Sequence, residues 1–161
     1  MDNITKIGGL SIGSEENPAA NETLEMVSMT KLNEVTGNIH VYNNGVKFVQ
    51  FDLLKAIEGD FVISSSTLTT LQIPELINVG GALNIFGMGK GAISTLVFPK
   101  VQTVKNSLSI NEISTLKSIS FPELIETGSI NFSSLPIEFE KLSMPKLSVV
   151  NGDCFIISNY I

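Results

Sequence analysis

Short apolar pairs recur along the chain, and each of four such pairs is followed directly by a proline. In each pair two apolar residues flank one other residue, which is the spacing of a short strand with one side turned inward. The pairs are Leu71/Ile73, Leu96/Phe98, Ile119/Phe121 and Leu142/Met144, and the prolines are Pro74, Pro99, Pro122 and Pro145. Because proline fixes φ and removes a backbone donor, it suits a corner where no ladder hydrogen bond is made. The pattern predicts a strand that ends in a sharp turn.

Two more apolar pairs complete each repeat. One is spaced three residues apart, as suits a bend, and comprises Leu32/Val35, Leu54/Ile57, Leu76/Val79, Val101/Val104 and Leu147/Val150. The last again alternates like a strand and comprises Leu10/Ile12, Ile39/Val41, Phe61/Ile63, Leu83/Ile85, Leu108/Ile110, Ile130/Phe132 and Cys154/Ile156. Successive members of this closing set start 29, 22, 22, 25, 22 and 24 residues apart. Three apolar sides per repeat predict a coil of triangular section.

A single coil of this kind cannot bury its own apolar side chains. Coils stacked about 4.8 Å apart place like residues in continuous inner columns and let neighbouring backbones pair. Glycines precede the closing strands and permit a sharp bend there; they are Gly37, Gly59, Gly81, Gly128 and Gly152. We therefore predict one all-β domain over residues 1–161, a β-solenoid of about seven turns of 22–25 residues. Cys154 is predicted to be a buried member of an inner column.

The repeat resembles that of a known family. Residues 68–85 read LTTLQIPELINVGGALNI, and residues 116–132 read LKSISFPELIETGSINF. This is similar to the repeat of the receptor L domain and its leucine-rich-repeat-like relatives in fungal and bacterial surface proteins, over nearly the whole chain. The resemblance implies a right-handed single-chain solenoid that recognises ligands or partners at a cell surface. Leu76 and its equivalents stand where typical leucine-rich repeats carry Asn.

Composition narrows the possible partners. The net charge is −6, and the basic residues are ten lysines with no arginine, so nucleic acid is a poor partner. No apolar run is long enough to span a membrane, and residues 1–9 do not have the features of a signal peptide. The resemblance nevertheless favours an extracellular or cell-surface location. Asn3, Asn21 and Asn131 begin Asn-x-Ser/Thr motifs, which are glycosylation acceptors in a eukaryotic secretory pathway.

Candidate catalytic and ligand-binding groups are sparse. The only histidine, His40, lies between inward Ile39 and Val41 and should point outward. Asp60 and Asp153 share a repeat position but lie four turns apart, too far to act on one glycosidic bond. Residues 87–91 lack the first Gly and the Ser or Thr of a nucleotide-binding loop. We expect no catalytic residue, no cofactor and no metal, and thus not an enzyme.

One edge of the predicted solenoid carries candidate partner contacts. A three-residue insertion in a turn accounts for the 25-residue spacing and places Phe86, Met88 and Lys90 on the edge that Tyr42 occupies two turns earlier. An exposed ridge of such side chains suits a contact patch, and ordinary loop packing is the alternative. We expect a non-catalytic recognition or adhesion module that binds a protein partner. A structural spacer or display domain and, third, a carbohydrate-active β-helix protein are the alternatives.

Two further expectations concern charge and chain ends. The residues after the corner prolines are Glu75, Lys100, Glu123 and Lys146, so opposite charges should face each other on adjacent coils. Neither end of the repeat array shows the polar cap that a solenoid needs. We expect a segment of a longer surface protein, or self-association through an uncapped end.

Overall fold

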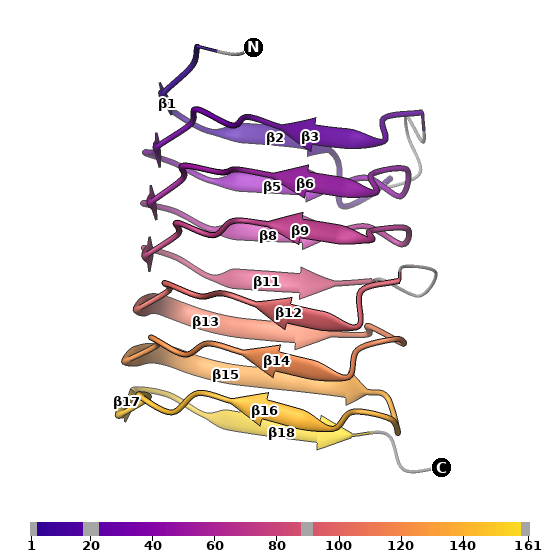
Figure 1. Ribbon diagram of the computed structural model, residues 1–161, viewed down its shortest axis with the longest axis vertical. Helices are drawn as coiled ribbons and strands as arrows, with labels where there is room; N and C mark the ends of the chain where they lie inside the picture. The colour runs from indigo at the N-terminus through magenta and orange to yellow at the C-terminus, as the bar shows by residue number, and fades with distance from the viewer. Residues whose placement is uncertain (1–2, 18–22, 88–91, 159–161) are drawn as a thin grey trace.

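The chain forms a solenoid of parallel strands, as predicted (Figure 1). The structure, a computed structural model, describes residues 3–17, 23–87 and 92–158. Over these ranges there is no helix, and therefore none that is long and apolar enough to cross a membrane. The strands make six complete coils and two strands of a seventh. Met88, Lys90 and Asn21 lie outside the described residues.

Each coil contributes to three faces. The proline face is named for the corner prolines that follow four of its six strands, and it consists of β3 (Met26–Ser28), β6 (Phe48–Gln50), β9 (Thr70–Gln72), β12 (Thr95–Val97), β14 (Ser118–Ser120) and β16 (Lys141–Ser143). The bend face contains β1 (Lys6–Ile7), β4 (Glu34–Val35), β7 (Ala56–Ile57), β10 (Asn78–Val79) and β17 (Val149–Val150). The closing face contains β2 (Leu10–Gly13), β5 (Ile39–Tyr42), β8 (Phe61–Ser64), β11 (Leu83–Phe86) and β18 (Cys154–Ser158). Two long strands, β13 (Thr103–Asn111) and β15 (Glu126–Leu135), run through the bend face into the closing face.

The inner columns follow the predicted register. Leu83 is paired with Phe61 on one side and Leu108 on the other, and all three side chains are fully buried. On the proline face Phe98 and Phe121 stack with ring centroids 4.5 Å apart and planes 3° apart. Burial of such columns from coil to coil is the main source of stability in this fold.

Side chains link one coil to the next at the turn before the closing face. The Asn38 Oδ1 atom accepts a hydrogen bond from the Asp60 N–H at 2.8 Å, and the Asp60 Oδ1 atom accepts one from the Ala82 N–H at 2.7 Å. A Cβ atom at Gly81 would overlap the Asp60 carboxylate and the Gly59 backbone. Glycine is therefore needed here because the coils approach closely, and this side-chain link fixes their register.

The predicted facing of opposite charges is confirmed for two pairs of coils. Lys100 Nζ lies 2.6 Å from a carboxylate oxygen of Glu75, and Lys146 Nζ lies 2.6 Å from one of Glu123. All four side chains are partly exposed, so each pair is worth roughly 0.2–1 kcal/mol. The pairs add more to register than to overall stability.

The prediction that Cys154 is buried is wrong, although its register is right. Cys154 pairs with Ile130, in the inner column that also contains Leu83 and Leu108, yet its side chain is exposed. A column residue is buried only where coils cover it on both sides, and among the described residues β18 pairs with β15 alone. Ile156 and Ile157 in the same strand are likewise exposed, by 50% and 54%.

Of the three faces, as far as the described ranges go, the proline face is the one whose ladder is interrupted. Strands β3, β6 and β9 form one three-stranded sheet, and β12, β14 and β16 form another. Within the part of the chain that the structure describes, no strand pairing joins β9 to β12, although they belong to adjacent coils (Figure 1). The step between these two coils is the one with the 25-residue spacing, from Leu83 to Leu108.

Candidate functional site

The outward side of the closing face carries an aromatic patch in a setting of small polar residues. The outward positions of its strands include Ser11, Ser64, Asn84, Ser109 and Asn131. The aromatic exceptions on its central strands are His40 and Tyr42 on β5 and Phe86 on β11, and these three residues are the aromatic patch. All three side chains are half-buried.

Register explains why residues 44 positions apart in the sequence meet. Tyr42 pairs with Ser64, and Ser64 pairs with Phe86, so the two aromatic residues stand in one column with a serine between them. The small serine leaves room for the rings to lean together, and their centroids lie 6.5 Å apart. The His40 ring meets Tyr42 edge to face at 5.8 Å. Such offset and edge-to-face arrangements are the favourable ones for aromatic pairs.

Val62 shows that the side chains of this region pack closely. It points outward, between His40 and Asn84 in its column, yet only 5% of it is exposed. It does not belong to the interior core of the solenoid. Neighbouring outward side chains must therefore cover it. The patch has an apolar floor and is a packed cluster rather than a set of isolated surface rings.

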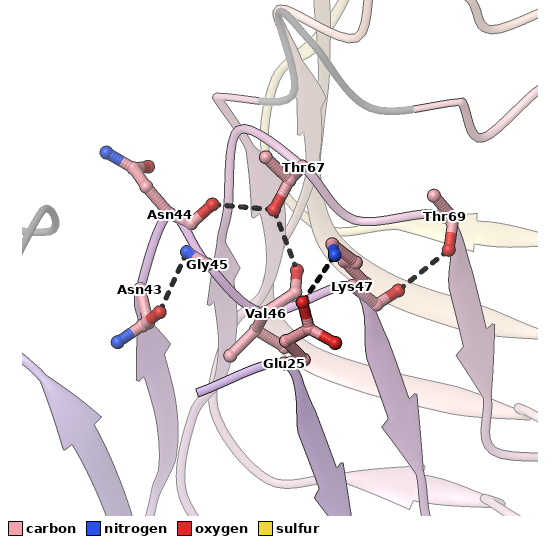
Figure 2. A network of polar contacts seen from close by, with 8 residues as sticks. All are labelled: Glu25, Asn43, Asn44, Gly45, Val46, Lys47, Thr67 and Thr69. Atoms are coloured by element: carbon pink, nitrogen blue, oxygen red, sulfur yellow. Dashed lines mark hydrogen bonds and ion pairs between the residues drawn. The ribbon is translucent and has the colours of Figure 1, made fainter. Parts of the chain in front are cut away.

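A network of polar contacts holds the turn that follows Tyr42 (Figure 2). The buried Asn43 side chain accepts a hydrogen bond from the Gly45 N–H at 2.9 Å, which closes the turn. The Thr67 hydroxyl on the next coil donates to the Asn44 carbonyl at 2.6 Å. Lys47 pairs with Glu25 of the preceding coil at 2.5 Å. Three consecutive coils are thus tied together beside Tyr42, and the edge that presents its ring is fixed.

The environment of Tyr42 keeps its phenol neutral. Burial raises the pKa of Tyr42 above its ordinary value of 10.0, and the negative charges of Glu15 and Asp60 raise this pKa further. The hydroxyl therefore remains a hydrogen-bond donor throughout the physiological pH range. A neutral amphipathic ring of this kind combines apolar contact with a directed polar bond, as tyrosines at interfaces do.

The structure brings together two of the four residues predicted as partner contacts. Tyr42 and Phe86 touch, whereas Met88 and Lys90 lie outside the described residues. Gly87, directly after Phe86, has φ of 76°, a left-handed value that favours glycine. His40 lies on the outward side, as predicted, but it was not among the residues predicted to form the contact patch. Its position two residues before Tyr42 on the same predicted strand was the available signal.

Other surfaces offer less for a ligand. No group of three or more His, Cys, Asp and Glu side chains within the described ranges is placed to hold a metal ion. A groove of about 540 Å³ on the bend face is lined by both Glu58 and Lys105, together with Asn78 and Thr103. The Thr103 hydroxyl already donates to the Asn78 side chain at 2.8 Å. An acid, a base and a polar pair that already bond to each other do not define one ligand chemistry.

Comparisons with known proteins give one distant relative. Over 125 residues the chain is 30% identical to the cell wall protein ecm33 of Schizosaccharomyces pombe. The match covers 74% of this chain but only 23% of that protein, so the chain spans about a quarter of the relative's length. No protein-family model matches the chain. No solved structure matches it either.

Proposed function

We propose that this chain is a non-catalytic recognition or adhesion module of a cell-surface or cell-wall protein and that its aromatic patch binds a protein partner. The observation that carries the proposal is the packed cluster of His40, Tyr42 and Phe86 on a face of small polar residues. Aromatic side chains over an apolar floor, ringed by small polar groups, have the composition of an interface centre and rim.

The remote relative supports the location. A fungal cell wall protein is 30% identical over most of the chain, which agrees with the surface location that the family resemblance of the repeat implies. The solenoid supplies a rigid support, since the patch rests on three adjacent parallel strands rather than on one loop. A rigid, preformed surface loses little conformational entropy when it binds.

Site-specific photo-crosslinking tests the proposal. A benzoyl-phenylalanine replaces Ser64, inside the patch, or Asn78, on the bend face, and each protein is irradiated with a detergent extract of Schizosaccharomyces pombe cell walls. We expect protease-sensitive crosslinked products from position 64 alone. These products should disappear when Tyr42→Ser and Phe86→Ser are added. Equal crosslinking from both positions, or none from position 64, would contradict the proposal.

A further inference from the structure

The interruption of the proline face is local to that face. The coils that contribute β9 and β12 remain joined elsewhere, because β10 pairs with β13 and β11 pairs with β13 at the usual register. On the proline face, strand pairing runs from β3 to β9 and resumes from β12 to β16. Over the described residues this wall of the solenoid therefore has a gap between β9 and β12, which we call the window.

A repeated hydrogen bond identifies the backbone groups left open in the window. In four regular coils, the residue before the corner donates its N–H to the last strand residue of the next coil: Met29 to Gln50, Phe51 to Gln72, Phe98 to Ser120 and Phe121 to Ser143. The equivalent bond, from Ile73 to Val97, is absent from the bonds among the described residues. The Ile73 N–H and the Val97 carbonyl thus face the window without each other as partners.

The window is bounded at both ends. At one end the Ala92 N–H donates to the Leu68 carbonyl at 3.3 Å. At the other end Lys100 Nζ bonds to both carboxylate oxygens of Glu75, at 2.7 and 2.6 Å. Among the described residues, only the segment between these contacts lacks backbone pairing, so the gap has a defined length.

An apolar pocket of about 370 Å³ lies in the window. Its lining includes Leu71 and Ile73 from one edge, Val97 from the other, and the two corner prolines Pro74 and Pro99. Leu71 is only partly buried, whereas its column neighbour Val49 is fully buried. Val97 is 50% exposed and is the one apolar residue in an outward column of serines and glutamines. A carboxylate, Asp52, also lines the pocket.

We propose that the window binds an extended peptide segment of a protein partner. A peptide carbonyl accepts a hydrogen bond from the Ile73 N–H, and a peptide N–H donates to the Val97 carbonyl. An aliphatic side chain fills the pocket, and a lysine or arginine of the peptide pairs with Asp52. Binding of this kind uses main-chain bonds at an open sheet edge for affinity and a side-chain pocket for specificity.

The chemistry of the window favours a cationic peptide over other ligands. Open backbone donors and acceptors beside an apolar pocket match another extended backbone with alternating side chains. The only charged side chain in the lining is acidic, and the whole chain carries a net charge of −6. Electrostatic complementarity therefore selects a basic partner segment. The window is separate from the aromatic patch, so this inference goes beyond the proposed function.

A peptide array with an NMR titration tests the proposal. The probes are capped hexapeptides that contain every combination of Thr, Val and Lys, and the strongest binder is titrated into the isotope-labelled 161-residue chain. We expect the largest amide shifts at Ile73 and Val97 and slower hydrogen exchange at Ile73. A version of the peptide with N-methylated backbone amides should lose the binding. Absence of any binder with a Kd below about 1 mM, or shifts centred elsewhere, would overturn the proposal.

Matched variants locate the site. Val97→Lys places a charge in the pocket and should weaken binding about tenfold or more, because a blocked anchor pocket removes the central contact. Ser120→Lys, in the same outward column of a regular coil, should change the affinity for the peptide by less than about twofold.

Asp52→Asn should remove most of the salt dependence of this affinity. The Tyr42→Ser/Phe86→Ser protein should bind the peptide normally, which separates failure here from failure of the aromatic patch. Equal loss in Val97→Lys and Ser120→Lys contradicts the proposed site.

Discussion

The closing face and the proline face are built from the same coils but respond differently to one insertion. On the closing face, strands from β2 to β18 form a continuous ladder, including across the coil with the 25-residue spacing. On the proline face the ladder stops at β9 and resumes at β12. We attribute the break to the extra residues between β11 and β12, which enter the chain just before the proline face. A solenoid of this kind accommodates a local change in length on one face while the others keep its register.

The largest expected effect is the loss of stability when an inner-column leucine is shortened, and this loss should differ between the two faces. Leu108 on the closing face is fully buried, so Leu108→Ala should lower the free energy of unfolding by about 2–5 kcal/mol through lost burial and a cavity. Leu71 at the window is only partly buried. Leu71→Ala should therefore lower the free energy of unfolding by about half as much. Urea denaturation followed by circular dichroism measures both. Equal costs would mean that the break does not loosen packing inside the coil.

Removing the insertion should repair the proline face. Deletion of residues 88–90 gives this coil the 22-residue spacing of its neighbours. We expect β9 and β12 to pair and the free energy of unfolding to rise by about 1–3 kcal/mol, since each ladder hydrogen bond contributes about 0.5–1.5 kcal/mol. Amide exchange at Ile73 reports the repair directly. If Ile73 exchanges at the same rate before and after the deletion, the insertion is not the cause of the break.

The ion pair at the window should matter more than its counterpart in a regular coil. Lys100 bridges coils that lack strand pairing beside it, whereas Lys146 joins coils already paired through β14 and β16. Lys100→Ala should cost roughly 0.5–1 kcal/mol, and Lys146→Ala should cost less than about 0.5 kcal/mol. Denaturation at low and high salt measures the difference. A larger loss for Lys146→Ala would show that the window does not depend on this contact.

The smallest expected effect is the pH dependence contributed by Tyr42. Its pKa is raised in the folded state, so the neutral phenol is favoured by folding. This contribution to stability is fully present below the unfolded pKa of about 10 and is lost as the pH rises through the higher folded pKa. Ultraviolet absorbance titration should show one tyrosine ionising late, and Tyr42→Phe should remove that step. A late step that persists in Tyr42→Phe would assign it to Tyr160.

Sequence periodicity predicted the architecture because each coil repeats the same spacing of apolar residues and corner residues. Alternating pairs such as Leu83/Ile85 indicated strands, and the prolines and glycines marked the corners that the structure contains. The contact of Tyr42 with Phe86 was harder to predict from the sequence, because it depends on the small residue Ser64 that lies between them in the register. The spacing of 25 residues indicated an insertion in a turn. It did not indicate the interrupted ladder, because strand pairing depends on how two neighbouring coils lie against each other and not on the length of one of them. Cys154 had the right register, and its exposure depends on which neighbours cover it.

The links between Asn38, Asp60 and Ala82 have a consequence for how the molecule folds. Each joins residues 22 apart in the sequence, and bonds between other neighbouring coils span similar separations, for example 21 residues from Phe51 to Gln72 and 25 from Gln102 to Ile77. Every new coil therefore closes a loop of nearly the same short length, and the entropy of closure does not grow as the array lengthens. A coil already in place offers its Asn or Asp oxygen to the backbone of the next one. We expect folding to proceed by successive addition of coils to those already formed, and coils that are covered on one side only to open first.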